Sequence, residues 1–430
     1  MKEKLIISGT GCALVDYLYK PVSFTAESFI RYLSLKPGDG GLSPGKLVFS
    51  EEFETFSGED YLTARERITQ GKPPVAQNIG GPSIVSMIHA AQMLSGLPAE
   101  VRFYGSKGQD AGAEFIDERL KMTPLKIGKY KTANHYTPFT DVLSDPSFDH
   151  GHGERIFINN IGAAWEMYPE DLDDAFFQSD IVVFGGTALV PHIHRSLCEL
   201  LSKAKDNHAI TVVNTVYDFL NEKQNPETPW PLGNSDETYR YIDLLITDRE
   251  EALRLSGRPS THKALDFFCT KGVGAAIVTH GANYVHYYSQ NKQFGQIEGR
   301  QCVSAKVIET LTQNPELAGD TTGCGDNFAG GVIASIAEQI IRRTNMASRT
   351  NESDEQTSPE HRSSGGREAE QSGNAYSKTV KHISLDFEDA IAMGIASGGY
   401  ACFYHGGTFY EQFPGQKRQL IEPYYKDCRD

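Results

Sequence analysis

Short, uninterrupted runs of apolar residues recur along the chain and predict buried β-strands. These runs lie at 5–7, 181–184, 210–213, 244–246 and 275–278. Continuous rather than alternating hydrophobicity indicates strands that are covered on both faces. Stretches with helical spacing separate the runs, so the order is strand, helix, strand, repeated along the chain. This order predicts an α/β fold in which helices cover both sides of a mostly parallel sheet.

Two of the predicted helices lie close to glycine-rich segments. One begins at Pro82, directly after Gly80-Gly81, and keeps apolar residues at helical spacing up to Leu94. Proline suits the first position of a helix, because its missing N–H is not needed there. A second helix, rich in small residues, is predicted around 387–400. Both helices are apolar enough to pack directly on the sheet.

Three stretches interrupt the strand–helix order. The segments 15–74 and 130–160 contain many turn-forming residues, and we expect them to form a small, β-rich cover over the sheet. The segment 345–379 is rich in Ser, Glu, Arg and Gly and has almost no large apolar side chains. It is expected to be disordered, since it cannot bury enough surface to offset its ordering entropy. The prediction is therefore one elaborated domain over 1–430.

Charge and composition narrow the range of partners. The chain of 430 residues is 39% hydrophobic and carries a formal net charge of −15. An acidic protein gains nothing from counterion release on nucleic acid, so a nucleic-acid partner is not expected. No apolar stretch is long enough to span a membrane, and the N-terminus does not resemble a secretory signal. We therefore expect no membrane partner.

The cysteines suggest a reducing compartment. The chain has seven, an odd number, and they are scattered without any C-x-x-C pair. Neither a disulfide framework nor a zinc site is indicated by such spacing. The predicted location is the cytoplasm.

The run Asp320-Thr321-Thr322-Gly323-Cys324-Gly325-Asp326 carries the chemistry. Apolar residues at helical spacing follow it, so Gly323, Cys324 and Gly325 are predicted at the start of a buried helix. Free backbone N–H groups and the helix dipole form an anion site there. Asp326 is either a helix N-cap or a general base that takes the proton from an attacking hydroxyl. The amides would then hold the charge that develops on a transferred phosphoryl group.

The whole run resembles the signature of the ribokinase-like (PfkB) carbohydrate kinases, Asp-Thr-x-Gly-Ala-Gly-Asp. Cys324 stands where alanine is usual, and we interpret it as a packed, inert thiol. The resemblance extends over nearly the whole chain. It implies a ribokinase-like three-layer α/β/α core with a small β-rich lid formed by 15–74 and 130–160. In such a fold Asp326 is the catalytic base.

The resemblance also implies an acceptor site near the N-terminus. Asp16, after an early strand and glycines, matches the family aspartate that binds substrate hydroxyls, and Gly80 and Gly81 match a glycine pair that contacts substrate. Val85 stands where the sugar kinases often have asparagine, which puts a ribose-like substrate in doubt. Asn78 could supply the lost polar contact, or it could be an ordinary turn residue.

For the nucleotide, the resemblance implies ATP bound with Mg²⁺. Asp248 and Glu251 match the family's Asn-x-x-Glu element, which orders magnesium through water. Thr279, Gly281 and Gly406 are the residues predicted to bind nucleotide. Tyr284 replaces a family glycine. Backbone oxygens of Asp320 and Thr322 are the candidates for a monovalent cation such as K⁺. The stretch 309–319 is longer than usual and either reshapes the ATP side or loops outward.

The predicted function is therefore transfer of the γ-phosphate of Mg-ATP to a hydroxyl of a small, sugar-like molecule. A nucleoside kinase and a non-catalytic sugar- or nucleotide-binding regulator are the alternatives on the same fold. A remote alternative is an NAD-dependent oxidoreductase, since Gly9-Thr10-Gly11 follows the first strand, but Leu14 occupies the third glycine position. In this family lids often form dimer contacts, so a homodimer through the lid is expected. Further candidate acceptor contacts in the lid are Asp39, His150, His152 and Arg155.

Overall fold

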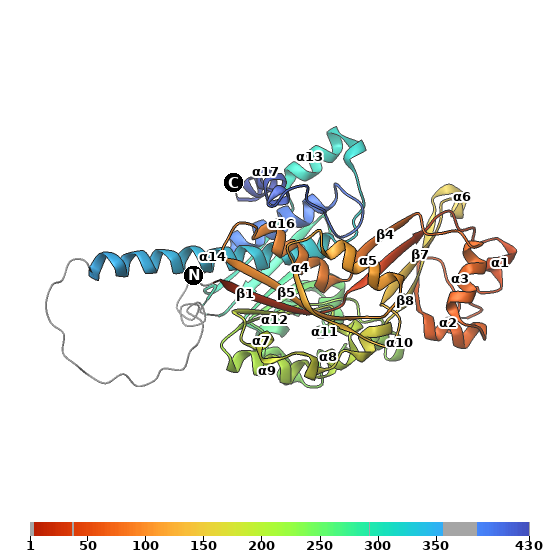
Figure 1. The fold of residues 1–430 in the computed structure, drawn as a ribbon, viewed down its shortest axis with the longest axis horizontal. Helices are drawn as coiled ribbons and strands as arrows, with labels where there is room; N and C mark the ends of the chain where they lie inside the picture. Colours follow the sequence, from red (N-terminus) through yellow and green to blue (C-terminus); the bar gives the residue numbers. More distant parts are fainter. Residues whose placement is uncertain (1–3, 37, 292, 356–384, 430) are drawn as a thin grey trace.

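A nine-stranded sheet forms the centre of the protein, seen in a computed structural model that describes residues 4–36, 38–291, 293–355 and 385–429 (Figure 1). Its strand order is β14-β13-β12-β11-β10-β9-β1-β5-β6. The strands are β1 (Leu5–Gly11), β5 (Ala99–Lys107), β6 (Lys126–Thr132), β9 (Ile181–Gly185), β10 (Ile210–Asn214), β11 (Leu244–Asp248), β12 (Ala275–Thr279), β13 (Tyr284–Ser289) and β14 (Ile297–Cys302).

Parallel pairing runs from β6 to β12, and only β13 and β14 are antiparallel at one edge. The five apolar runs of the sequence are β1 and β9 to β12, and the interior of each is buried. Strands that are buried on both faces need no alternating polar residues, which is why these strands appear as uninterrupted apolar runs in the sequence. The carboxyl ends of these parallel strands meet along one edge of the sheet, where sites in open α/β sheets are found.

Helices cover both faces of this sheet (Figure 1). Residues of α4, α5, α14 and α16 share one apolar core with one face, and residues of α9, α11 and α12 share a second core with the other. The helices are α4 (Pro82–Met93), α5 (Ala111–Leu120), α7 (Asp174–Phe177), α8 (Pro191–Arg195), α9 (Leu197–Asp206), α10 (Phe219–Gln224), α11 (Arg249–Ser256), α12 (Thr261–Thr270), α13 (Ala305–Gln313), α14 (Cys324–Glu355), α16 (Phe387–Ala401) and α17 (Gln416–Arg429). The predicted three-layer α/β/α architecture is confirmed.

A second, five-stranded sheet projects from one end of the core and is called the small sheet below (Figure 1). Its order is β3-β8-β7-β2-β4, with β2 (Leu14–Tyr19), β3 (Leu47–Phe49), β4 (Ala76–Gly80), β7 (Phe139–Asp145) and β8 (Glu154–Asn160). Its outer face packs through a third apolar core on α1 (Glu27–Ile30), α2 (Ser50–Ser57) and α3 (Tyr61–Thr69). The inner face is thereby left free for the site.

Two stretches are more regular than the sequence indicated. The segments 15–74 and 130–160, expected to be rich in loops, contain most of the small sheet and its three covering helices. Their strands pair with partners up to a hundred or more residues away, and such pairing leaves little local signal. The segment expected to be disordered, 345–379, begins inside α14, which extends to Glu355, and from 356 onward it lies outside the described residues.

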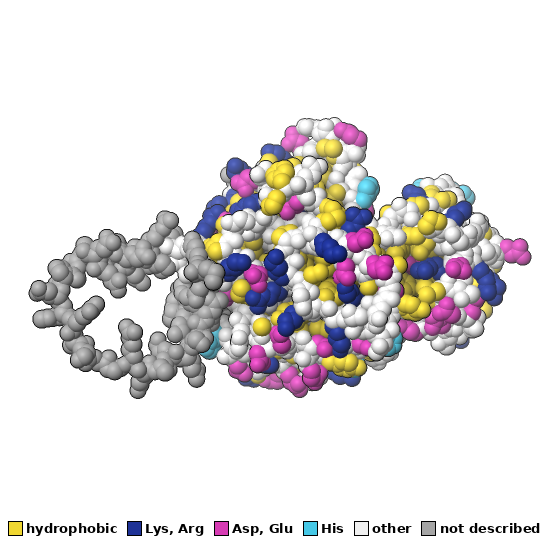
Figure 2. Space-filling view, in the orientation of Figure 1, with side chains coloured by type: hydrophobic (Ala, Val, Ile, Leu, Met, Phe, Trp, Pro, Cys, Tyr) yellow, Lys and Arg dark blue, Asp and Glu magenta, His cyan; other side chains and the backbone are white. Residues whose placement is uncertain are grey.

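Surface charge on the visible face is mixed. Figure 2 shows Lys and Arg side chains interspersed with Asp and Glu over the core and the small sheet, without one broad basic region on that face. Among the described residues, none of the helices is both long enough and apolar enough to cross a membrane.

Candidate active site

The signature run forms a tight loop that leads into α14. The helix begins at Cys324, as predicted, and Gly323 before it has a left-handed φ of +76°. A Cβ atom on Gly323 would lie 2.4 Å from the Cα of Gly407, so only glycine fits this close approach. The Cys324 N–H donates a long bond of 3.3 Å to the oxygen of Thr321. A Cβ atom on Gly325 would meet nothing within 4 Å, so the start of the helix is open there.

Asp326 lies in the first turn of α14, beside these amides. Its carboxyl is surrounded by protein although part of it still reaches solvent, and burial raises its pKa to about 6. A carboxylate with a pKa near 6 is ionised at neutral pH and is a better proton acceptor than an ordinary aspartate. The position therefore suits a general base.

Asp16, on β2 of the small sheet, faces the same region. Burial raises the pKa of Asp16 to about 7, and the negative charges of Asp326 and Asp320 add to the effect. This coupling shows that the three carboxylates converge, although they are far apart in sequence. A Cβ atom on Gly80 would lie 2.1 Å from the Asp16 carboxylate, so glycine is needed beside it. Gly81, with φ +100°, begins the tight turn into α4.

A pocket of about 210 Å³ lies in front of Asp326. Five residues named from the sequence or its motifs line it: Asp326, Gly325, Asp248, Glu251 and Thr279. They come from α14, α11 and the ends of β11 and β12, so the fold brings the general base and the candidate magnesium residues together. The pocket's three carboxylates, Asp326, Asp248 and Glu251, would favour phosphate groups only together with a cation.

Asp248 and Glu251 interact with each other at the start of α11. The Glu251 N–H donates to the Asp248 carboxylate at 2.8 Å, and the Asp248 N–H reaches the Glu251 carboxylate at 3.4 Å, which forms a capping box. Burial, followed by the charge of Asp248, raises the pKa of Glu251 to about 7. The hydroxyl of Thr215 also donates to Glu251. A nearby cation would stabilise the ionised form of this carboxyl.

In the part of the chain that the structure describes, no group of three or more His, Cys, Asp or Glu side chains is placed to hold a metal ion. Magnesium usually keeps several waters and is held by one or two carboxylates together with substrate phosphates. Asp248 and Glu251 fit such a minimal donor set, because Asp248 is exposed and Glu251 lines the pocket.

A second pocket, mainly apolar and about 340 Å³ in volume, adjoins the first and shares Thr279 and Gly325 with it. Gly281 lies at its edge, and α13 and α16 form its walls, with Val307 and Ile395 among the lining residues. A flat apolar base fits a pocket of this kind. The unusual stretch 309–319 belongs partly to α13, and its Leu311 lines the pocket. This segment therefore shapes the pocket rather than looping outward.

The turn after β12 forms without the family's second glycine. The N–H of Asn283 bonds to the oxygen of His280 at 3.0 Å, and Gly281 supplies the left-handed residue with φ +51°. Tyr284 lies past the turn, where it begins β13 and pairs with Cys302. Tyrosine at this position is thus compatible with the turn.

Gly406, predicted to bind nucleotide, does not line either pocket. A Cβ atom on Gly406 would lie 2.6 Å from the side chain of Asn78, and its N–H points at the Asp320 carboxylate at 3.3 Å. The turn that contains it faces the small sheet instead. Val85 is buried under the same turn, against Gly407. Val85, which departs from the family pattern, and Asn78, which could supply the lost polar contact, thus both contact this turn.

Asp320 connects the signature loop to this turn. Besides Gly406, its carboxylate accepts the N–H of Thr322 at 2.8 Å and lies 3.5 Å from the His405 ring. These contacts fix the loop in front of α14. These contacts use only the side chain of Asp320. Its backbone oxygen, a candidate ligand for a monovalent cation, takes no part in them.

Two residues that the sequence did not reveal support α14 from behind. The side-chain amide of Asn327 donates to the oxygens of Gly323 and Gly407, each at 2.8 Å. Lys417, only 1% exposed, donates to the Asn327 side-chain oxygen at 2.8 Å. Burial lowers the pKa of Lys417 to about 7. Asn327 directly follows the signature run, but Lys417 lies 90 residues away on α17, where no local pattern marks it.

A row of polar side chains crosses the inner face of the small sheet. Asn78, Asp16, Thr140 and Asn159 occupy directly paired positions on β4, β2, β7 and β8, so their side chains point to the same side. The Asn159 amide donates to the Thr140 hydroxyl at 2.9 Å. We call these four residues the polar row. Thr140 and Asn159 were not identified from the sequence, since their alignment depends on strand register.

Of the four lid residues proposed as further contacts, Asp39 has a local role. Its carboxylate accepts the N–H groups of Leu35, Lys36 and Gly41, at 2.7, 3.0 and 2.9 Å. These bonds lower its pKa to about 2, although burial acts in the opposite direction. This is the pattern of an Asx turn.

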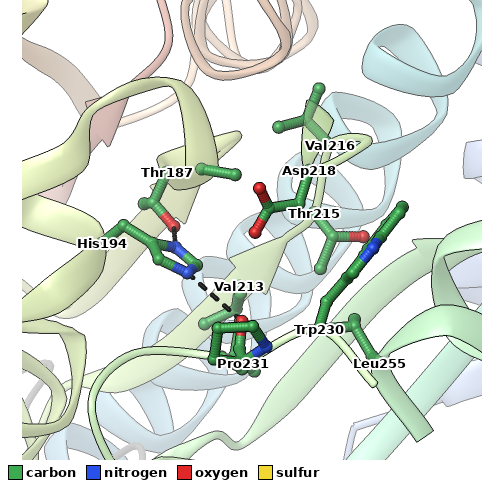
Figure 3. A pocket seen from close by; sticks show the side chains of 11 residues that line it. Thr187, His194, Val213, Thr215, Val216, Asp218, Trp230, Pro231 and Leu255 are labelled. Carbon is green, nitrogen blue, oxygen red and sulfur yellow. Dashed lines mark hydrogen bonds between the residues drawn. The ribbon is translucent and has the colours of Figure 1, made fainter. Parts of the chain in front are cut away.

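A separate pocket beside the one of about 210 Å³ is too small to compete as an acceptor site. Figure 3 shows Thr187 and His194 on one side and Asp218 and Trp230 on the other. The His194 ring bonds to the Thr187 hydroxyl at 2.9 Å and to the oxygen of Pro231 at 3.3 Å. Its volume is about 10 Å³, room for about one water molecule.

Comparison with known proteins agrees with this architecture. The model of the pfkB family carbohydrate kinases matches residues 63–357. An adenosine kinase of Schizosaccharomyces pombe is 22% identical over 310 residues, which cover 68% of this chain and 84% of that protein.

Solved structures of similar fold have low sequence identity. A probable sugar kinase from Rhizobium etli has a TM-score of 0.61 at 14% identity, covering 98% of this chain and 99% of that one. An adenosine kinase from Schistosoma mansoni in complex with 2-fluoroadenosine has a TM-score of 0.60 at 14% identity, with 94% and 97% covered. A ribokinase from Thermotoga maritima has a TM-score of 0.54 at 18% identity, with 98% and 99% covered.

The protein is a kinase that transfers a phosphoryl group to an alcohol group of a small molecule. More particularly, the chain belongs to the pfkB family of carbohydrate kinases, and its acceptor is a sugar or a nucleoside. Kinases of this family use ATP, usually with Mg²⁺. The oxidoreductase alternative is not favoured.

Proposed function

We propose that this kinase transfers the γ-phosphoryl group of Mg-ATP to a hydroxyl of a sugar-like acceptor, with Asp326 as the general base. The observation that carries the proposal is that Asp16 of the small sheet lies close enough to Asp326 of α14 for their charges to interact, and that Asp326 lines a pocket adjoining a mainly apolar one. The adenine would occupy the apolar pocket and the phosphates the pocket lined by Asp326. The acceptor would then lie between α14 and the polar row.

The proposal gives each group a step. With a pKa of about 7, Asp16 is partly ionised at neutral pH, and this ionised form accepts hydrogen bonds from acceptor hydroxyls. Asp326 takes the proton of the attacking hydroxyl as its oxygen bonds to the γ-phosphorus and the bond to ADP breaks. Free amides in the first turn of α14, at Gly325 above all, stabilise charge on the transferring group. Magnesium held near Glu251 and Asp248 would neutralise the remaining phosphate charge.

The polar row favours an acceptor with several hydroxyl groups. Asn78, Asp16, Thr140 and Asn159 offer donors and acceptors along a line, which suits a polyol or sugar ring. The small sheet would act as a lid that excludes water. Backbone oxygens of Asp320 and Thr322 are the proposed ligands of a monovalent cation, and a homodimer through the small sheet is proposed for the assembly.

A nucleoside acceptor is the second candidate, and one finding favours it: the curated relative described above and several of the similar structures are adenosine kinases. A nucleoside presents the same ribose hydroxyls to Asp16. The two candidates differ in one requirement: a nucleoside needs room for its base beyond the ribose, and a free sugar does not.

The experiment is a panel of free sugars, sugar acids, sugar phosphates and nucleosides, assayed for ADP release with Mg-ATP. We expect a sugar-like compound to give the highest kcat/KM. The matched control is the Asp326→Asn variant with the same compounds, which removes background ATP hydrolysis from contaminants. A panel in which only nucleosides are phosphorylated would select the second candidate, and a panel without any turnover would contradict the proposal.

A further inference from the structure

Two cysteines from distant parts of the chain meet at the edge of the apolar pocket. Cys324 is the first residue of α14, and Cys402 follows the last residue of α16. Their sulfur atoms lie 3.5 Å apart, and both residues line the apolar pocket of about 340 Å³. Each is partly exposed rather than fully buried. The sequence had suggested an inert, packed thiol at 324, but the partner thiol changes that interpretation.

This pair differs from the other cysteines. Cys12 is buried, and Cys198, Cys269, Cys302 and Cys428 each lie elsewhere on the protein. The Cys324–Cys402 contact is the one hydrogen-bonding approach between cysteine sulfurs, and all seven cysteines lie within the described residues. A disulfide has sulfurs about 2.05 Å apart, so the two atoms need to approach by roughly 1.5 Å. A displacement of that size is within reach of side-chain rotation.

We propose that Cys324 and Cys402 are a redox-sensitive pair whose oxidation to a disulfide closes the nucleotide pocket and stops phosphoryl transfer. The proposal rests on the proposed function in one respect, the assignment of the apolar pocket to the nucleotide. The proposal adds a modification site, the Cys324–Cys402 pair. The reagent that modifies it is a two-electron oxidant of the peroxide class.

The chemistry balances with hydrogen peroxide as the oxidant. One thiolate attacks a peroxide oxygen, which gives a sulfenic acid and, after protonation, water. The second thiol attacks the sulfenic sulfur, forms the S–S bond and releases a second water. The two thiols lose two protons and two electrons in total, and the peroxide takes up both. A dithiol reverses the step by thiol–disulfide exchange.

The surroundings explain why a small movement would matter. A Cβ atom on Gly398 would lie 2.9 Å from the Cys324 oxygen, so α14 and α16 are already in close contact and α14 has little room to move. The Cys402 side must therefore adjust. The Cys402 oxygen accepts the N–H of Gly319 at 2.8 Å, directly before the signature run. A shift of Cys402 thus pulls on the loop that presents the anion-binding amides.

Occupation of the pocket should oppose the oxidation. Both sulfurs belong to the lining, so a bound adenine would cover them and hold the walls apart. Oxidation and nucleotide binding are then mutually exclusive, and each weakens the other to the same extent, as linkage requires.

The test treats the full-length protein with hydrogen peroxide, with and without Mg-ADP, and blocks the remaining free thiols by alkylation. Peptide mass spectrometry should find a link between the peptides that contain Cys324 and Cys402. Mg-ADP should slow its formation at least about fivefold. Calorimetric titration should show that oxidation weakens Mg-ADP binding at least about tenfold and that dithiothreitol restores it. These readouts need no acceptor, so they separate this proposal from the proposed kinase activity.

Variants make the result specific. Cys402→Ser and Cys324→Ala are each compared with their own reduced form, and we expect peroxide to leave their Mg-ADP affinity unchanged. Cys198→Ser and Cys302→Ser, outside the pair, should respond to peroxide as the wild type does. The proposal is overturned if the linked peptides are not found, or if peroxide weakens nucleotide binding in Cys402→Ser as much as in the wild type.

Discussion

The two sides of the active site are built in different ways. On the side proposed to bind the phosphates, one loop and one helix start, from Asp320 to Asp326, carry the proposed amides and the proposed base within seven consecutive residues. On the acceptor side, four strands each supply one side chain of the polar row. The first construction is local and depends on the backbone, whereas the second depends on strand register. We therefore expect changes on the phosphate side to affect kcat and changes on the acceptor side to affect acceptor KM.

The largest effect is expected for Asp326→Asn. Amide replaces carboxylate at nearly the same size, so the fold and Mg-ATP binding should persist while proton transfer is lost. General-base catalysis contributes about 10²–10⁴-fold, and kcat should fall within that range. Steady-state kinetics with Mg-ATP and acceptor measure this kcat. Asp320→Asn, in the same run, is the control and should lower kcat much less.

Asp16→Asn should have the next largest effect, on the acceptor. Hydrogen bonds to a charged group contribute about 1.5–3 kcal/mol, so kcat/KM for the acceptor should fall roughly 10–150-fold. KM for Mg-ATP should change little, as Asp16 belongs to the small sheet. The matched control is Asp149→Asn, which changes an exposed carboxylate between β7 and β8 of the same small sheet. An equal rise in both KM values would contradict the division between the two sides.

Lys417→Met tests the support behind α14. Methionine fills similar volume but removes the bond to Asn327, so Gly323 and its loop are held less firmly. We expect kcat to fall roughly tenfold, the worth of one hydrogen bond of about 1–1.5 kcal/mol, with acceptor KM unchanged. Thermal unfolding should show little loss of stability, because burial already disfavours the charged form of this lysine. Lys417→Arg should not rescue kcat, since the buried site has no room for the larger head group.

Thr140→Val should have the smallest effect. Valine keeps the shape of threonine but removes the hydroxyl that accepts the Asn159 amide. Acceptor KM should rise about three- to tenfold, with kcat within twofold of the wild type. If kcat falls instead, the polar row acts in the chemical step and the comparison of the two sides fails.

Sequence alone predicted the core fold and the helix start that carries Asp326. Strands buried on both faces and a seven-residue run with glycines at fixed spacing carry their own local signal, so the core fold and the place of Asp326 followed from them. Lys417 and Cys402 escaped notice, because each acts through a partner far away in the chain. Thr140 escaped notice because its alignment with Asn159 and Asp16 depends on strand register. Gly406 was assigned to the nucleotide, yet it packs on Asn78, since which side of a turn faces the small sheet depends on tertiary contacts.

The most direct test of the account is the pH dependence of kcat with Mg-ATP and the best acceptor both saturating. Burial raises the pKa of Asp326 to about 6, and only its ionised form can accept a proton. The bound acceptor and Mg²⁺ should keep Asp16 and Glu251 ionised, because each favours the charged form of the carboxyl beside it. We therefore predict that kcat is level above that pH and falls about tenfold per unit below it, as Asp326 becomes protonated. In Asp326→Asn this acid limb should vanish along with most of the activity. An acid limb that persists unchanged in Asp326→Asn would contradict the assignment of the base.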